Sequence, residues 1–463
     1  MDFKLTPSSI EGLGETEQKK LMDLIRVYDY HSIKNAEKDR YYEGRIPLGE
    51  VNLGLALPKT LRNLEIGCAW GAKTVDVLAA RSMFDGFVDE NGADVDQLNQ
   101  IVVGNQLIAE YQKTCRDELK YGCSFATLSS DPAIGCKIRF HSPQTAAAIW
   151  NGEKGRIDCG FAVIDTRTDD IDNIQIPTII NLYTDDAVYV LTWVDENQWV
   201  AKRHPHKMGR PLMEPLIWNA TSSKPFGRSR IKEPIRRLIQ GYVRTIANAT
   251  IGLEFSTSPQ KYILGVTDAQ YDKLINDKFR TYVGSLIAST ANPETGTNPV
   301  FGQLPQGTLA PHVEMLRVLS TQFSAASGLT VTDTGVVNDA NPTSSDAILA
   351  QSQTLIGMAE QLNTGNGNAL RTIALMAIAI ANNTTMEAIP DEQKSIIAHF
   401  QNPAMPSVAV TADAAIKIAS ARENFANTDV FLEMIGFDQA DIRRIKAQEQ
   451  RARGQQVLLE LEE

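Results

Sequence analysis

The chain has 463 residues, and its 45 Lys and Arg against 56 Asp and Glu give a formal net charge of −11. Apolar residues at 43% and charged residues at 22% are typical of a folded protein, which argues against disorder, a collagen-like chain and a coiled-coil rod. At roughly 150 residues per domain the length predicts about three folded parts, and the acidic balance argues against a protein that grips nucleic acid tightly.

The first section, to about residue 128, shows helical spacing of apolar residues at 17–30 and 97–119. From about residue 123 to 200 the pattern changes to short strand-like runs with turn residues between them, such as Asn151-Gly152. The runs are 136–140, 160–164, 178–183 and 187–193, with a further turn at 184–186. This order predicts a mainly helical α+β fold rather than a doubly wound parallel sheet.

Two long helices are predicted around a module at residues 254–309. The first follows Pro225-Phe226-Gly227 and ends near Leu253, with apolar side chains on one arc and cations on the opposite side. The second opens with Pro311 and stops at Gly328. Between them we expect an extended segment at 255–266, a helix at 267–285 and a stretch rich in Pro, Gly, Asn and Thr at 289–306.

A polar loop is predicted at residues 329–343, with Ser344 capping the helix that follows. The run Asn363–Gly367 is expected to interrupt that helix before it resumes at 370–381. Shorter helices are predicted in the tail, at 412–425 and 439–453.

The cysteines and the apolar stretches indicate the compartment. The five cysteines are odd in number and include no C-x-x-C pair, which predicts neither a disulfide framework nor a zinc site and favours a reducing compartment. The amino terminus, Met1–Lys4, lacks the features of a signal peptide. The longest apolar stretch, 373–381, is too short to cross a bilayer. We therefore expect a soluble, cytosolic protein with no membrane contact.

Several segments imitate sites of known chemistry. Leu64–Gly71 resembles the glycine loop of methyltransferases that bind S-adenosylmethionine, but Trp70 stands where a small residue is needed and residues 58–63 make a poor buried strand. The overlapping Gly67–Thr74 fails the spacing of a phosphate loop. Residues 169–172 lack the glycine and late glutamate of a calcium loop. His204 and His206 are interpreted as a basic surface loop in preference to metal ligands. We expect no catalysis, cofactor or metal ion.

Two charge features remain. A cationic stripe accompanies the first long helix, and it is interpreted as a solvated face, a subunit contact or a surface for phosphate. Its members are Arg228, Arg230, Lys232, Arg236, Arg237 and Arg244. The second feature is an absence, because no Lys or Arg occurs from Val318 to Leu370. A polar loop without cations suits a surface past which a polyanion slides without being held.

The order of these parts resembles the portal proteins of tailed bacteriophages, particularly those of long-tailed phages. The segment from Pro225 to Ile231, followed by the long helix, is the most specific match. The other segments that carry the resemblance are Asp39–Gly44, Val75–Phe87, Asn99–Ser124, Ser258–Gly265, Phe323–Gly328 and Asn341–Ile348. Together they span most of the chain.

The resemblance implies a portal-type subunit. Its parts would be the amino-terminal wing at 1–226, stem helices at 227–253 and 310–328, the clip at 254–309, the tunnel loop at 329–343, the long wing helix at 344–384 and the crown at 385–463. The tunnel-loop residues expected to face DNA are Leu329, Thr330, Val331, Thr332, Asp333, Thr334, Gly335, Val336, Val337, Asn338 and Asp339. Lysines at Thr332 and Thr334 are expected to slow DNA passage while leaving ring assembly intact.

The same resemblance implies a function and partners. Subunits would form a homo-oligomeric ring, commonly of twelve, at one capsid vertex, and double-stranded DNA would pass through it during genome packaging and ejection. The terminase large subunit, a head-tail adaptor, the major capsid protein and scaffold would be partners, and the protein would reside in the virion after assembly in the host cytoplasm. Two other hypotheses stay open here: a methyltransferase using Gly67 and Gly71, and a sequence-independent DNA-binding module using the cationic stripe.

Overall fold

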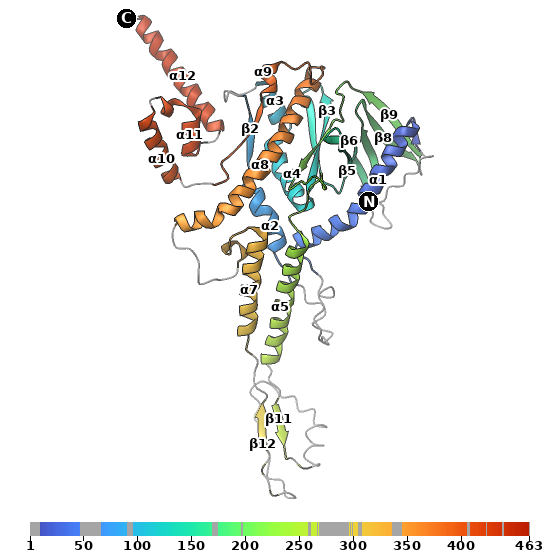
Figure 1. The fold of residues 1–463 in the computed structure, drawn as a ribbon, viewed down its shortest axis with the longest axis vertical. Helices are drawn as coiled ribbons and strands as arrows, with labels where there is room; N and C mark the ends of the chain where they lie inside the picture. The colour runs from blue at the N-terminus through green and yellow to red at the C-terminus, as the bar shows by residue number, and fades with distance from the viewer. Residues whose placement is uncertain are drawn as a thin grey trace.

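The fold is α+β, as predicted, with a broad body, a pair of long helices that projects from it and a separate group of helices at the carboxy-terminal end (Figure 1). The structure, a computed structural model, describes residues 10–46, 66–89, 96–168, 175–195, 198–257, 261–265, 267, 296, 298, 300–303, 308–335, 345–404, 408–422, 424–437 and 439–462. Within these residues no helix has the length and apolar character needed to cross a membrane.

A six-stranded sheet forms one side of the body, in the order β1-β9-β8-β7-β6-β5. Its strands are β1 (Ile10–Glu11), β5 (Ala146–Asn151), β6 (Arg156–Thr168), β7 (Gln175–Tyr183), β8 (Ala187–Asp195) and β9 (Gln198–Pro205). Helix α1 (Glu15–Tyr42) contacts β5 and β6 and buries Leu21, Leu24 and Tyr28 against the sheet. The predicted strand runs 160–164, 178–183 and 187–193 lie in this sheet, and both predicted turns, at 151–152 and 184–186, are confirmed. The fourth predicted run, 136–140, is also a strand, in the second part of the body.

The second part of the body is built around helix α8 (Ser345–Ala381). This helix contacts a three-stranded sheet, β10-β3-β4, and a two-stranded sheet, β13-β2. The strands are β2 (Phe84–Val88), β3 (Cys123–Asp131), β4 (Gly135–His141), β10 (Met213–Ile217) and β13 (Ile397–Phe400); the short helices here are α2 (Trp70–Ala79), α3 (Asp96–Gly104) and α9 (Asp391–Lys394). Side chains of α8 such as Leu370 and Ile373 are fully buried in the main core.

The predicted interruption of α8 at Asn363–Gly367 is wrong, because the helix is continuous across it. Asn366 is fully buried, and its Nδ2 donates to the hydroxyl of Tyr111 at 2.9 Å and to Oε2 of Glu118 at 2.7 Å. These tertiary hydrogen bonds favour the helix in a run whose local propensity is poor.

The helix predicted at residues 97–119 is instead two helices, α3 and α4 (Leu107–Tyr121). The break lies at Gln106, which has a left-handed backbone with φ of 50°. The buried side chain of Asn105 accounts for it, since its Nδ2 donates to the carbonyls of Ile101 and Cys136 and its Oδ1 accepts from the amide of Ile138, each at 2.9 Å. Asn105 thus ties the end of α3 to β4.

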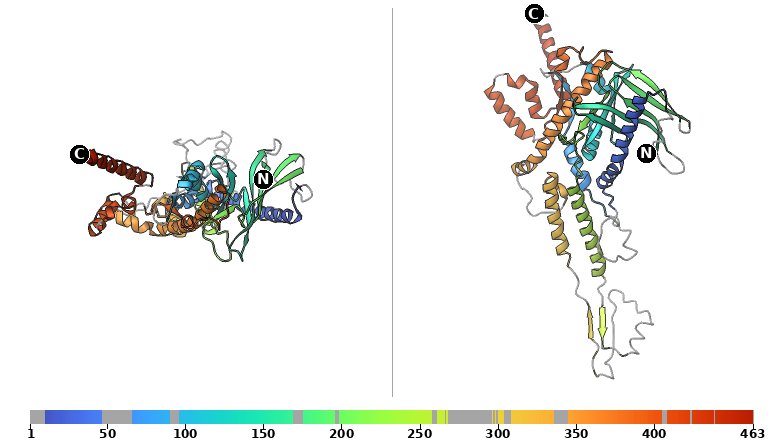
Figure 2. Two further views of the ribbon diagram at one scale, coloured as in Figure 1. Left: turned by 90° about the horizontal axis from the view of Figure 1, so that it is seen from above. Right: turned by 45° about the vertical axis from the view of Figure 1, so that its right-hand side comes forward.

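The helix pair consists of α5 (Glu233–Thr257) and α7 (Ala310–Ser327), which pack along each other and project away from the body (Figures 1 and 2). Both were predicted, although α5 begins at Glu233 with Pro234 in its first turn. The buried apolar residues of α5 recur every four positions at Ile235, Ile239, Val243, Ala247 and Ile251, and Ile231, just before the helix, continues the series. At the far end β11 (Lys261–Leu264) and β12 (Val300–Gln303) form an antiparallel ribbon. The predicted helix at 267–285 lies outside the described residues, apart from Thr267.

The carboxy-terminal helices α10 (Val408–Ala421), α11 (Asp429–Ile435) and α12 (Gln439–Glu462) lie at the opposite end of the molecule from α1 and the six-stranded sheet (Figure 2). The described side chains of these helices bury little: Ala415 and Ile442 are enclosed, whereas Ile416 and Val430 are more than half exposed. Few of the described side chains in this group are therefore buried.

Candidate functional site

The candidate site is the junction at which the helix pair meets the body, because the predicted loop after α7 begins there. Gly328 ends α7 with a left-handed backbone, φ of 72°, a conformation that favours glycine. The hydroxyl of Ser324 donates to the carbonyl of Leu329 at 2.6 Å. Asp333 accepts from the amide and hydroxyl of Thr330 at 3.0 and 2.8 Å, and a 3-10 turn spans Thr332–Thr334. The first half of the loop is therefore folded by its own polar side chains.

Helix α2 holds this half-loop against the body. The indole Nε1 of Trp70 donates to the carbonyl of Thr334 at 3.0 Å, and the ammonium of Lys73 donates to the carbonyl of Asp333. The hydroxyls of Thr334 and Ser320 are 2.7 Å apart, which joins the loop to α7 as well. Leu329 and Thr334 are buried, whereas Thr332 and Gly335 are exposed. Thr332 is thus the polar side chain of this half-loop that is presented to solvent.

This placement corrects one expectation about the loop. A lysine at Thr334 would not line a surface, because the Thr334 side chain is 6% exposed and hydrogen-bonded to Ser320. Val336, Val337, Asn338 and Asp339 lie outside the described residues.

An aromatic stack lies directly under the loop. The ring of Trp70 is stacked on Phe323 of α7, with centroids 4.5 Å apart and planes at 20°, and it lies 4.7 Å from the ring of Tyr242 of α5. Trp70 is 3% exposed. One side chain of α2 therefore contacts both long helices and the loop between α7 and α8.

Arg230 binds the same junction from its other side, and this corrects its assignment to an exposed cationic stripe. Its side chain is 6% exposed. Nε donates to the carbonyl of Thr74 at 2.6 Å, and Nη2 donates to the carbonyl of Ser327 at 2.7 Å. Burial lowers the pKa of Arg230 to about 10, so the guanidinium stays charged at neutral pH. Its charge faces the carboxyl end of α7, where the helix dipole favours a cation.

The other predicted cations of the stripe fall into two groups. Arg236 pairs with Glu37 of α1 and with Glu233, and Arg237 pairs with Glu233 at 2.7 Å. Arg228, Lys232 and Arg244 are exposed and have no ion pair among the described residues. Partial shielding of its ammonium from water, followed by repulsion from Arg230 and Arg228, lowers the pKa of Lys232. The exposed cationic face is therefore smaller than predicted and consists of Arg228, Lys232, Arg237 and Arg244.

The segment that resembled a methyltransferase loop has a packing role. A Cβ added at Gly71 would lie 1.9 Å from the carbonyl oxygen of Tyr41, so α2 can approach the end of α1 this closely only with glycine there. Gly67 pairs with Arg45 in an isolated bridge. The Trp70 side chain fills the space in which that class of enzyme would need a small residue. These contacts give no support to cofactor binding.

The histidines considered as metal ligands lie at the end of β9 and just beyond it. His204 is exposed, and burial lowers the pKa of the half-buried His206. Among the described residues no three His, Cys, Asp or Glu side chains come together as a cation site. The acidic residues at 169–172 lie outside that set. All five cysteines are buried and free, and burial raises the pKa of Cys68 and Cys123 to about 12.

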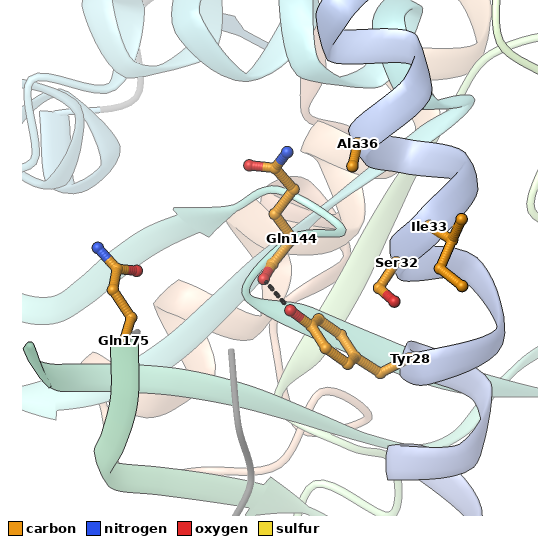
Figure 3. Close-up of a pocket in the computed structure, with 6 residues that line it drawn as sticks. All are labelled: Tyr28, Ser32, Ile33, Ala36, Gln144 and Gln175. Carbon is orange, nitrogen blue, oxygen red and sulfur yellow. Dashed lines mark hydrogen bonds between the residues drawn. The ribbon is translucent and has the colours of Figure 1, made fainter. Parts of the chain in front are cut away.

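A groove of about 380 Å³ runs along α1 (Figure 3). The hydroxyl of Tyr28 donates to the backbone carbonyl of Gln144 at 2.8 Å and closes one side of the groove. Ser32 donates to the carbonyl of Asp29 in its own helix. The lining residues, Tyr28, Ser32, Ile33, Ala36, Gln144 and Gln175, include no carboxylate or histidine that would serve as a general base. This groove offers no catalytic set.

Comparison with known proteins gives one family and several partly similar structures. The family model described as "Phage portal protein, SPP1 Gp6-like" matches residues 23–455. The comparison with curated proteins gave no match. Among solved structures, a chain in the neck of an empty gene transfer agent (GTA) particle, computed with C6 symmetry, is 12% identical with a TM-score of 0.45, covering 82% of this chain and 95% of that one.

Two further solved structures have similar sequence identities and TM-scores. A chain in the neck of the native GTA particle, computed with C12 symmetry, is 11% identical with a TM-score of 0.43 and covers 85% of this chain and 99% of that one. A chain in the virion of the native GTA particle is 12% identical with a TM-score of 0.44, and the match covers 76% of this chain and 86% of that one.

Proposed function

We propose, from the premise that this chain belongs to the SPP1 Gp6-like family of phage portal proteins, that its copies close into a ring through which double-stranded DNA enters and leaves a capsid. The carrying observation is the extent of the family match. It runs from α1 to α12 and so includes the body, the helix pair and the carboxy-terminal helices. The family is one of structural proteins, and the contacts of Trp70 and Gly71 leave the methyltransferase hypothesis without support.

In this proposal the projecting helix pair is the stem. Helices α5 and α7 of all copies would stand around the channel, and residues 254–309, which include the last turn of α5, would form the clip. The ribbon of β11 and β12 supports a contact role, because four of its large apolar side chains are exposed: Tyr262, Leu264, Val300 and Phe301. Exposed apolar surface of this kind is typical of sites that a partner covers. We assign the terminase large subunit and, after packaging, a head-tail adaptor to this end.

The body and the carboxy-terminal helices complete the assignment. The sheets, α1 to α4 and α8 would be the wing, which faces the major capsid protein and scaffold. Helices α10 to α12 would be the crown. The complete assembly would be a homo-oligomeric ring, of twelve copies in our proposal, at one vertex of the virion, formed earlier in the host cytoplasm.

The loop after α7 is proposed as the tunnel loop. Its described half is anchored by Trp70 and Lys73, and its polar tip at Thr332 is exposed. No Lys or Arg occurs from Val318 to Leu370. A stiffly held polar loop without cations would line a constriction and hold no phosphate, which suits DNA that must move. The expectation for Val336 to Asp339 remains a prediction.

The exposed cations Arg228, Lys232, Arg237 and Arg244 are proposed as a contact with the neighbouring subunit. A closed ring needs two different surfaces on each copy that fit one another. In a chain with net charge −11, a cationic face on a stem helix is complementary to most other surfaces of the molecule, which favours an acidic neighbour as its partner.

Native mass spectrometry of the purified protein tests the ring. We expect one closed oligomer whose mass is a fixed multiple of the subunit and does not grow with concentration. A monomer at every concentration, or an open series of increasing masses, would contradict ring closure.

A further inference from the structure

The inference concerns a cavity of about 950 Å³ on the body, away from the stem junction. Strands β3, β4, β6, β7 and β8 line it, together with the segment after β9 and the end of α8. Its walls are largely apolar and include Ile164, Val188, Val190, Leu212 and Ile380. We call it the basic cavity because of the side chains described next.

The charged side chains that line the basic cavity, Arg139 and Lys207, are both cationic, and no Asp or Glu lines it. His204 and His206 line it as well, and burial lowers the pKa of His206, which favours its neutral form. Arg139 and Lys207 are exposed and have no ion pair among the described residues. In a protein with net charge −11, this is a local reversal of the overall balance. Apolar walls beside unpaired cations suit a ligand that is both apolar and acidic.

One segment of the chain has that chemistry. Residues 457–463 read Val-Leu-Leu-Glu-Leu-Glu-Glu, so four apolar side chains accompany three carboxylates and no cation. Helix α12, which contains most of this segment, extends away from the body, and its end lies far from β3, β8 and β9 of the same copy in Figure 1 and on the opposite side of the molecule from the N-terminus in the left view of Figure 2. This segment would therefore reach the cavity only from another copy.

We propose that the basic cavity receives residues 457–463 of a second copy of this chain, with the apolar side chains on its walls and the glutamates at Arg139 and Lys207. The proposal rests on the ring assembly above, since a ring brings identical copies side by side. It would link the crown of one subunit to the wing of another. The apolar walls favour this peptide over the phosphates of DNA, which would leave those walls uncovered.

Binding of a peptide tests the cavity without requiring a ring. A fluorescent peptide of residues 454–463 is titrated into the full-length protein, and its anisotropy is measured. The double variant Arg139→Glu, Lys207→Glu is expected to weaken binding about tenfold or more, since two attractive pairs become repulsive. Lys202→Glu is the matched control, because Lys202 is exposed on β9 and does not line the cavity. A peptide carrying Lys at Glu460 and Glu462 should recover affinity for the double variant.

Photo-crosslinking then asks whether the contact joins two copies. A photoreactive residue replaces Leu461 in full-length protein assembled from equal parts of ¹⁴N and ¹⁵N material. We expect mixed-isotope crosslinks to the segment 204–208 or to the end of α8. Crosslinks within one copy, or to other segments, would overturn the inference. In the titration it would be overturned if the double variant and Lys202→Glu bound the peptide equally well. It would also be overturned if duplex DNA at equal charge displaced the peptide. Rings seen without these crosslinks would refute the inference and leave the proposed function standing; bound peptide without rings would refute ring assembly instead.

Discussion

At the scale of single residues, two buried ionisable groups join helices through hydrogen bonds, and neither has an ion pair within the part of the chain that the structure describes. Arg230 joins carbonyls of α2 and α7. Glu118 of α4 is fully buried beside Asn366 of α8, and burial raises its pKa to about 8. Arg230 therefore links α7 to the body through charge-assisted hydrogen bonds. Glu118 joins α4 to α8 within the body and keeps its proton at neutral pH.

Replacement of Arg230 should destabilise the junction. Arg230→Met keeps much of the apolar volume but leaves the buried carbonyl of Ser327 without its donor, and we expect the free energy of unfolding to fall by about 2–3 kcal/mol. Arg228→Met, two residues away and exposed, is the control and should change it by less than about 0.5 kcal/mol. Urea unfolding measures both. Equal values for the two variants would show that the Arg230 contacts do not stabilise the fold.

Glu118 predicts a pH dependence with a definite sign. Its folded pKa, about 8, lies above the ordinary value of 4.5. Between these values the unfolded chain releases the proton while the folded protein keeps it, so the free energy of unfolding falls as pH rises, by up to about 1.4 kcal/mol per pH unit. Glu118→Gln removes this dependence. The free energy of unfolding of the variant minus that of the wild type, measured with urea, should therefore rise as the pH is raised from 5 to 8. A difference that stays constant with pH would exclude the raised pKa.

At the scale of elements, the junction brings α2, α5, α7 and the following loop into one packed unit. Trp70 contacts Phe323, Tyr242 and the loop carbonyl of Thr334. Gly71 lets the same helix lie against the end of α1. We therefore expect any movement of the proposed tunnel loop to be coupled to α2 and to the end of α7.

Gly71→Ala tests the close approach of α1 and α2. The added Cβ would overlap the carbonyl of Tyr41, a backbone group that cannot shift without moving α1. We therefore expect the free energy of unfolding, measured by thermal unfolding, to fall by about 1–3 kcal/mol. Gly67→Ala has open space around its Cβ and is the matched control. A methyltransferase loop would require both glycines, so equal damage from the two changes would contradict the packing explanation.

Lysine substitutions in the loop separate its buried and exposed positions. Thr334→Lys would place a charge in a site that is 6% exposed, and we expect lower stability. Thr332→Lys adds a cation at an exposed position, so folding should be unchanged while DNA passage slows, because the new charge attracts phosphate. Melting temperature and the rate of DNA packaging distinguish the two. Unchanged packaging in a stable Thr332→Lys protein would remove residues 329–335 from the constriction.

The long helices and the strand runs were predictable because their apolar residues recur with regular periods over many positions. The exceptions depended on distant partners. Nothing near Asn363–Gly367 shows that Asn366 would meet Glu118 and Tyr111, and nothing near Gln97–Leu119 shows that Asn105 would bind β4. In the same way the sequence predicted the cationic stripe. The burial of Arg230 and the ion pair of Arg236 with Glu37 could be seen only in the tertiary structure.

At the scale of the whole molecule, the distribution of charge matters more than its sum. The net charge of −11 argued against a tight DNA binder, and a channel that surrounds DNA without gripping it agrees with that argument. Exposed cations lie on α5, just before it and in the basic cavity, and no Lys or Arg occurs from Val318 to Leu370. We interpret these cations as contacts between copies, and the loop at 329–343 within the cation-free stretch as the surface toward DNA.

The position of the loop in the assembled ring is the most direct test of this account. Since all five native cysteines are buried, Thr332→Cys provides one exposed thiol to which a compact gold cluster can be attached. Electron microscopy of end views should then show a ring of protein with the gold signal around the central opening. Gold on the outer rim, or labelled protein that forms no rings, would contradict a portal in which this loop lines the channel.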